Sequence, residues 1–292
     1  FHHFLDVCPE VRQEIIHHYL HNERATGTMN KCLHYDDWNS KCCVWEWPEQ
    51  LIICDKESAD ELPPPWMALW LPGMAFTSKG MLAEVAVQMF RTTRSIDFKY
   101  HPDHRFKVVK WLSKFLDTVG GWNVIKGVCF PHIHRYENVR GGIVINSTNP
   151  DVDFMKRCAN LERISLTFHC SAMNSWPLDD GMRVHKSLDS VLDYFQLRPI
   201  LDCPNLKTIF LDGIKPNFGL QLQFPDNSLK TLKDLGNWLF DEYKKVHGRE
   251  IEVMLHERYG KYRGVQTGVV LKGRVAQILT DAREAADRAA AN

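Results

Sequence analysis

The chain has 292 residues, of which 44% are hydrophobic and 25% charged, enough for one large globular domain or two ordinary ones. Lysine and arginine together number 36, as do aspartate and glutamate, so the zero net charge argues against a whole-molecule attraction to nucleic acid or membranes. No apolar run approaches the ~18 residues of a membrane-spanning helix, and the first residues, FHHFLDVCPEVRQ, do not form a signal peptide. The chain begins with Phe1 instead of Met, which leaves room for residues upstream.

Nine cysteines are scattered along the chain, and their odd number is atypical of a secreted disulfide framework. We therefore predict reduced thiols in an intracellular protein, either cytoplasmic or nuclear. The adjacent Cys42 and Cys43 lie in a predicted strand, where neighbouring side chains point to opposite faces. This favours one buried and one exposed thiol over a reactive pair.

The stretch FLDVCPEVRQEIIHHYL predicts a short amphipathic helix near the start of the chain. Pro9 suits its first turn, where a missing N–H costs nothing, and Glu10 lies near the positive end of the helix dipole. An apolar stripe follows and requires a partner surface inside or outside the chain. Its members are Val11, Ile15, Tyr19 and Leu20.

The next segments predict strands around a second helix. Apolar residues within 44–53 surround a Pro-Glu-Gln break, which predicts a β-hairpin. The PPPW run at 63–66 is typical of a rigid extended link. The stretch FTSKGMLAEVAVQMFRTTRSIDF then predicts a capped helix with one apolar side, followed by a strand at 95–98.

Two similar phrases, CANLERISL (158–166) and CPNLKTIFL (203–211), lie 45 residues apart. In each, the spacing L-x-x-I-x-L places the last two apolar side chains on one face of a strand, and the preceding Asn suits a turn. A helix is predicted before each strand, with Asp151 as the N-cap of the first and Ser187 as that of the second.

The same order of helix and strand continues on both sides of the repeated phrase. RFKVVKWLSKFLDTVGG predicts an amphipathic helix that ends at Gly120 before a strand at 125–130. Downstream, a helix capped by Asn227 or Ser228 and closed by Gly248 precedes the alternating strand EIEVML. Such repetition predicts parallel strands with helices on one side, similar to irregular leucine-rich repeats. The alternative is an ordinary α/β sheet with two similar turns.

Motifs for catalysis and metal binding are weak in this sequence. It contains no G-x-S-x-G, Walker or G-x-G-x-x-G motif, so we predict that the protein is not an enzyme. His132, His134, His169 and Cys170 are residue types that zinc prefers, but neither a C-x-x-C pair nor a familiar four-ligand spacing accompanies them. We predict no metal and no cofactor.

The segment GKYRGVQTGVVLKGR interleaves basic and aromatic residues. This composition can bind single-stranded nucleic acid, and it is also common on a solvated hairpin, which the zero net charge favours. The basic residues that nucleic acid would contact are Lys261, Arg263, Lys272 and Arg274. The final stretch, ILTDAREAADRAAAN, predicts a frayed or solvated helix.

Taken together, FLDVCPEVRQEIIHHYL, FTSKGMLAEVAVQMFRTTRSIDF and FLDTVGGWNVIKGV resemble a large group of fungal F-box-like proteins over most of residues 4–214. Members of this group open with an L-P-x-E-[IV]-R helix and continue with a T-x-K-x-x-x-E-A helix, a strand and irregular leucine-rich-type units. The resemblance implies that the first helix binds a Skp1-type adaptor. The positions that match are Pro9, Glu10, Val11, Ile15 and Leu20.

The predicted fold class is α/β, with a short N-terminal F-box-like helical region and irregular leucine-rich-repeat-like helix–strand units that form a mainly parallel sheet. We expect an F-box-like region with a hairpin at 1–75, the repeat-like domain at 76–257, and a basic hairpin with an Ala-rich helix or tail at 258–292. The resemblance implies a non-catalytic interaction protein that recruits a target protein to a cullin-type ubiquitin ligase. The alternative is a binding scaffold without a ligase, including nucleic-acid binding through 258–274.

Overall fold

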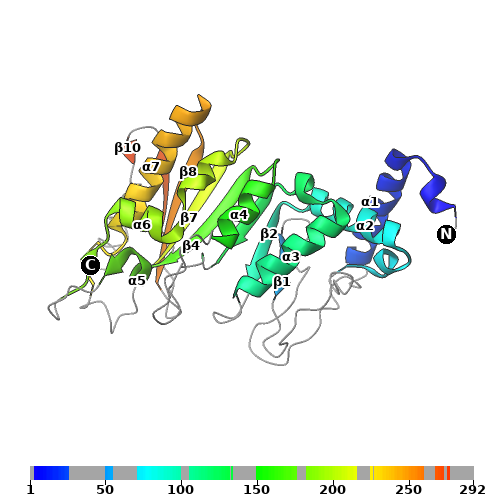
Figure 1. Cartoon of the computed structure of the whole chain (residues 1–292), viewed down its shortest axis with the longest axis horizontal. Helices are drawn as coiled ribbons and strands as arrows, with labels where there is room; N and C mark the ends of the chain where they lie inside the picture. Colours follow the sequence, from blue (N-terminus) through cyan, green and yellow to red (C-terminus); the bar gives the residue numbers. More distant parts are fainter. Residues whose placement is uncertain are drawn as a thin grey trace, which may run out of the picture. The chain divides into compact units, whose positions relative to one another are not determined.

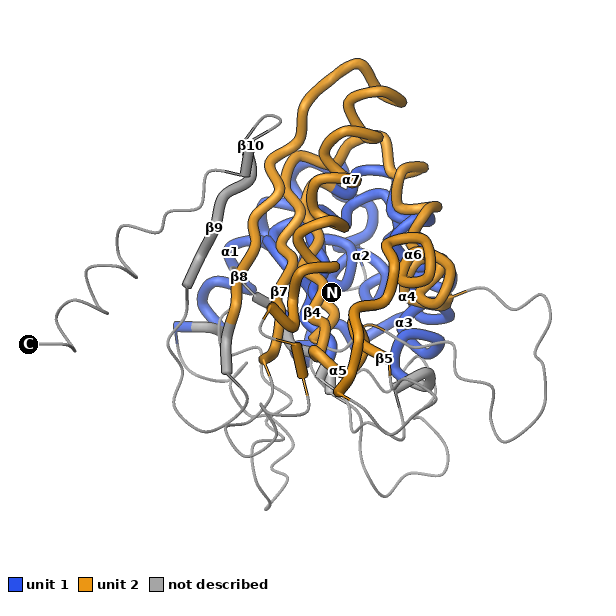
Figure 2. The backbone as a smooth tube through the Cα atoms, turned by 90° about the vertical axis from the view of Figure 1, so that its left-hand side faces the viewer, with its two compact units in different colours: residues 1–129, 153–161 blue, residues 130–152, 162–292 orange. Residues whose placement is uncertain are grey.

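The protein has a mixed α/β structure with parallel strands, as the sequence predicts, and it divides into two compact units in the computed structural model (Figures 1 and 2). Unit 1 comprises residues 1–129 and 153–161, and unit 2 comprises residues 130–152 and 162–292. No helix among the described residues is both long enough and apolar enough to cross a bilayer. The structure describes residues 3–25, 50–54, 71–99, 105–131, 133, 149–175, 182–215, 224–225, 227–259, 267–272 and 275–276.

Unit 1 contains three parallel strands in the order β1–β2–β3. Leu51 lies opposite Ile96, and Ile96 lies opposite Val128, so apolar side chains line up across the strands. All three are buried. The elements in chain order are η1 (Phe4–Asp6), α1 (Pro9–Ala25), β1 (Gln50–Cys54), η3 (Gly73–Phe76), α2 (Lys79–Thr92), β2 (Ser95–Lys99), α3 (Arg105–Val119), η4 (Trp122–Val124) and β3 (Gly127–Phe130).

Unit 2 contains the parallel strands β4, β7 and β8, followed by antiparallel β9 and β10. The short β5 and β6 pair separately. The elements are β4 (Arg163–His169), α5 (Cys170–Met173), β5 (Asn174–Ser175), β6 (Val184–His185), α6 (Leu188–Phe195), η5 (Arg198–Asp202), β7 (Thr208–Lys215), α7 (Lys230–His247), β8 (Glu252–Tyr259), β9 (Thr267–Lys272) and β10 (Val275–Ala276). One further helix, α4 (Pro150–Arg157), has residues in both units.

The repeated phrase is explained by the register of unit 2. Ile164 on β4 lies opposite Ile209 on β7, and the next inward-facing pair, Leu166 and Leu211, lies two residues further on. The 45-residue offset therefore places equivalent side chains side by side, and β8 extends both rows with Val253 and Leu255. All six are at most 2% exposed, on the face that α6 and α7 cover (Figure 2).

Several predicted helix ends are confirmed. The Ser187 hydroxyl accepts a hydrogen bond from the backbone N–H of Ser190, at 3.2 Å, so Ser187 is the N-cap of α6. Gly120 and Gly248 follow α3 and α7 with φ of +72° and +68°. A side chain is strained in this left-handed region, and glycine is not, which is why both helices end there.

Two predicted caps are wrong. Asp151 lies inside α4, and the Asn149 side chain accepts from its backbone N–H at 3.0 Å. Pro150 occupies the first helical position, which moves the cap to the residue before it. At α7 the N-cap is Leu229, which makes no side-chain hydrogen bond. The predicted residues, Asn227 and Ser228, therefore do not cap the helix through their side chains.

Only the second arm of the predicted hairpin at 44–53 lies within the described residues. This arm forms β1, which pairs in parallel with β2 through the whole of 50–54. A continuous apolar run such as LIIC is typical of a strand in a parallel sheet. The first arm, the link at 63–66, the pair Cys42–Cys43 and the Ala-rich end lie outside the described residues.

The predicted domain ranges do not coincide with the two units. Helix α1 packs against α2, with Ile16 and Leu20 fully buried, so the predicted boundary at residue 75 falls inside one packed unit. The range 76–257 is divided between the units. Strands β8 and β9 pair antiparallel, with Glu257 opposite Thr267, and the first arm of this pair lies mostly in the predicted range 76–257.

Candidate interaction surfaces

Helix α1 has two different apolar sides. Ile16 and Leu20 are fully buried and lie one turn apart on the side that packs within unit 1. Val11 and Ile15 also lie one turn apart, but they are 47% and 42% exposed. The predicted single stripe is therefore divided, because the buried line runs through Ile16, one position beyond the predicted Ile15.

Four of the five positions predicted to bind an adaptor are exposed. Pro9 and Glu10 are exposed in the first turn of α1, and Val11 and Ile15 are exposed on a side that faces away from Ile16 and Leu20. Leu20 is the exception, because its side chain belongs to the buried side of the helix. On the neighbouring η1, Leu5 is 44% exposed. We call the exposed pair Val11 and Ile15 the α1 outer pair.

Arg12 fixes the position of α1. Its Nε donates to Glu84 Oε2 on α2 at 2.8 Å, and its Nη2 lies 2.6 Å from Oε1 of the same carboxylate. Its Nη1 donates to the backbone carbonyl of Leu5, at 2.8 Å, and to that of Val7. One guanidinium therefore ties η1 and α1 to α2. Two of its nitrogens match the carboxylate of Glu84, and the third binds the backbone carbonyls of Leu5 and Val7.

A groove of about 220 Å³ lies beside this ion pair, between α1 and α2. At its other end, Arg91 Nη1 donates to Gln13 Oε1 at 2.6 Å and to Gln88 Oε1 at 3.1 Å. We call it the α1–α2 groove. It is lined by Pro9, Arg12, Gln13, Ala83, Glu84, Val87, Gln88, Arg91 and Val119.

The polar residues of this groove were not predicted from the sequence. The sequence does indicate one of them. Arg12, Ile16 and Leu20 are spaced four residues apart and so lie on the same side of α1. A charged residue on the buried line of a helix requires a partner of opposite charge. The sequence does not say which acidic residue provides it.

The sheet of unit 2 has a second face, opposite α6 and α7. Its side chains alternate with the buried ones and are mostly half-buried, whereas His169 and Glu252 are exposed. The face combines apolar and polar groups in register, such as the row of Ser165, Phe210 and Met254. We call it the outer face. Its described members are Arg163, Ser165, Thr167, His169, Thr208, Phe210, Asp212, Ile214, Glu252, Met254 and His256.

One row of the outer face contains the residue types of a hydrolase triad, namely Thr167, Asp212 and His256. The Thr167 hydroxyl donates to Asp212 Oδ2 at 3.3 Å, and the His256 ring packs edge-on against Phe210 with centroids 6.1 Å apart. A catalytic triad requires the hydroxyl to contact the imidazole and the imidazole to contact the carboxylate. Here the hydroxyl contacts the carboxylate, so the row is arranged as a polar ladder across the sheet.

The candidate metal ligands are only partly described. His169 Nδ1 accepts from the backbone N–H of Ser171 at 3.2 Å and lies 3.7 Å from the Cys170 sulfur. Burial raises the pKa of the Cys170 thiol to about 11, which disfavours the thiolate that a metal would need. His132 and His134 lie outside the described residues. Elsewhere in the described part of the chain, no three His, Cys, Asp or Glu side chains are grouped to hold a metal.

Of the candidate nucleic-acid residues, only the backbone of one lies within the described part of the chain. Lys272 belongs to the backbone of β9, and its side chain is not described. Lys261, Arg263 and Arg274 lie outside the described residues. Nucleic-acid binding through this segment therefore stays a prediction.

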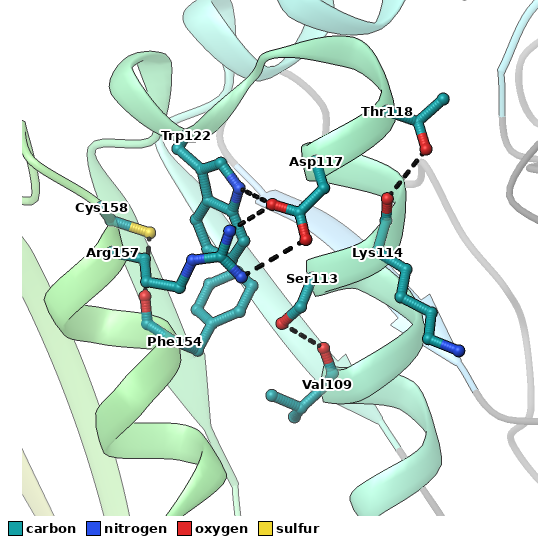
Figure 3. A network of polar contacts seen from close by, with 9 residues as sticks. All are labelled: Val109, Ser113, Lys114, Asp117, Thr118, Trp122, Phe154, Arg157 and Cys158. Carbon is teal, nitrogen blue, oxygen red and sulfur yellow. Dashed lines mark hydrogen bonds and ion pairs between the residues drawn. The ribbon is translucent and has the colours of Figure 1, made fainter.

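A polar junction in unit 1 joins α3, η4 and the end of α4 (Figure 3). Arg157 pairs with Asp117, and its guanidinium lies 3.8 Å from the ring centroid of Trp122. Trp122 Nε1 donates to Asp117 Oδ1 at 2.9 Å. Hydrogen bonds from Arg157 and then Trp122 lower the pKa of Asp117. Beneath them, Phe154 packs against Trp122 with centroids 5.1 Å apart, so the junction links α3, η4 and α4 through paired polar groups above an aromatic contact.

Comparisons with known proteins return no match to this chain, whether with family models, with curated proteins or with solved structures.

Proposed function

We propose that this protein is a non-catalytic interaction module that recruits target proteins to a cullin-type ubiquitin ligase, in the cytoplasm or the nucleus. The observation that carries the proposal is the α1 outer pair. Val11 and Ile15 remain exposed while Ile16 and Leu20 anchor the opposite side of the same helix. An anchored helix with an exposed apolar pair is suited to docking in the hydrophobic groove of an adaptor of the Skp1 type.

Target selection is assigned to the outer face of unit 2. Parallel strands there present short rows of side chains at regular spacing. The row with Phe210 and Met254 supplies apolar contact, and the row with Asp212 and His256 supplies polar contact. Aromatic and Met side chains with a few polar groups are the composition that protein interfaces favour.

The proposal is tested by capture of a purified Skp1-type adaptor on the intact chain. We expect the double variant Val11→Asp/Ile15→Asp to lose at least about tenfold in affinity, because two charges would enter an apolar interface. Both residues are exposed, so the change should leave the fold intact. The matched control is Val246→Asp on α7, where the valine is 56% exposed in the other unit.

Two results would count against adaptor docking. One is failure of the intact chain to capture the adaptor, and the other is equal capture by the double variant and the Val246→Asp control. Salt-sensitive capture of RNA in place of the adaptor would support the alternative, a scaffold that uses residues 258–274.

A further inference from the structure

The α1–α2 groove contains a positive charge that no carboxylate among the described residues balances. Arg91 is held by two neutral amide oxygens, from Gln13 and Gln88, and both bonds use the same nitrogen, Nη1. Within the described part of the chain, no acidic side chain lies within ion-pair distance of Arg91. Arg91 lies in the last turn of α2, so the carbonyl end of the helix dipole offsets part of its charge. The N–H groups on Nε and Nη2 remain available to a ligand.

The other arginine of the groove, Arg12, shows which kind of group a guanidinium binds there. Arg12 lines the same groove and is already matched by Glu84, through two contacts of 2.8 and 2.6 Å. The three charged side chains of the groove therefore sum to one net positive charge. Because the two glutamines fix the Arg91 side chain in place, little rotamer entropy remains to be lost when an anion binds.

We infer that the α1–α2 groove binds an acidic segment of a partner protein, with an Asp or Glu carboxylate on Arg91. The groove, of about 220 Å³, is large enough for one side chain and part of its neighbours. The apolar lining includes Ala83, Val87 and Val119, so aliphatic residues beside the acid would also be buried. This contact goes beyond the proposed function, because it involves another side of α1 and does not require an adaptor.

Val87 provides a sharp test, because it lies four residues before Arg91 on α2 and lines the groove. A glutamate at this position can pair with Arg91 along the helix, and Glu placed N-terminal to a cation at i, i+4 stabilises a helix. Val87→Glu thus supplies the missing carboxylate from within the chain, with the amide contacts of Arg91 preserved. Val87→Gln has nearly the same shape without the charge and is the matched control.

The experiment pans a displayed library of random 12-residue peptides on the intact chain and, in parallel, on Val87→Glu. We expect peptides enriched only on the intact chain, each with at least one Asp or Glu. The best peptide is then synthesised with a fluorescent label and measured by anisotropy. Its affinity should fall about tenfold or more on Arg91→Gln and on Val87→Glu, and within about threefold on Val87→Gln and on the control Arg94→Gln, at an exposed site.

The inference is overturned if no peptide is specific to the intact chain, or if the enriched peptides carry no acid. It is also overturned if Val87→Glu binds the peptide as well as Val87→Gln does. If Arg91→Gln lost peptide affinity only because α1 no longer packed on α2, Val87→Glu would not share the loss. Val87→Glu keeps Arg91 and its two glutamine contacts. Failure here leaves adaptor capture by the α1 outer pair unaffected, so the two proposals fail separately.

Discussion

Single polar side chains join elements that are distant in the sequence. Asp117 on α3 accepts from Trp122 on η4 and pairs with Arg157 on α4, 40 residues further along the chain (Figure 3). Arg12 does the same for η1, α1 and α2 through Glu84, 72 residues away. Each contact requires a partner that no local pattern in the sequence identifies.

The Asp117 junction predicts a pH-dependent contribution to stability. Folding lowers the Asp117 pKa below its ordinary value of 3.8, so the contribution is complete above about pH 4 and is lost as the pH falls through the lowered pKa. The two side chains are 51% and 46% exposed, so solvent screening limits the pair to about 0.5 kcal/mol. Urea unfolding of the wild type and Asp117→Asn should show this difference at pH 6 and a progressively smaller one as the pH falls below 3.8.

Equal stability of wild type and Asp117→Asn at pH 6 would show that the junction contributes nothing.

At the scale of elements, the strands of unit 2 owe their register to two apolar rows. The rows Ile164–Ile209–Val253 and Leu166–Leu211–Leu255 both face the helices. A slip of one residue would turn every one of these side chains to the opposite face. The register and the burial of the rows therefore depend on each other.

Truncation within a row should be costly, and truncation on the opposite side of the same strand should not. Leu211 is fully buried, so Leu211→Ala should lower the free energy of unfolding by about 2–5 kcal/mol, from lost burial and the cavity left behind. Ile214 on the outer face is half-buried, and Ile214→Ala should lose less than half as much. Urea unfolding measures both, and equal losses would contradict the assignment of the two faces.

At the scale of the whole molecule, unit 1 is built from two separate parts of the chain. Residues 153–161 belong to it, although 130–152 belong to unit 2. Phe154 is almost fully buried and packs against Phe98, with centroids 5.4 Å apart, and against Trp122. The first 129 residues alone therefore lack part of their own core.

This division predicts different behaviour for two fragments. Residues 1–161 should resist proteolysis and show a cooperative thermal transition, whereas residues 1–129 should be cleaved rapidly. Loss of Phe154 alone is expected to cost about 3–5 kcal/mol, a large part of the stability of a small unit. Phe154→Ala in the longer fragment is the matched variant and should resemble the shorter one. Equal resistance of all three would show that residues 153–161 are dispensable.

The sequence by itself determined the longer helices, most strands of the parallel sheet and the equivalence of the two copies of the repeated phrase. Alternation in the strands and 3.6-residue periodicity in the helices are local properties, so Ile164, Leu166, Ile209 and Leu211 could be assigned to one buried face without coordinates. The positive φ of Gly120 and Gly248 is likewise readable, because glycine tolerates it and other residues do not.

The tertiary structure alone decided which surfaces are available. An amphipathic pattern does not say which of two adjacent apolar lines packs inward, and docking of α1 on α2 buried Ile16 and Leu20 while it left Val11 and Ile15 exposed. In the same way, only the positions of Glu84 and Gln13 show that Arg12 has a carboxylate partner and that Arg91 has amides. Pairing across 70 or more residues depends on long-range packing, about which local periodicity carries no information.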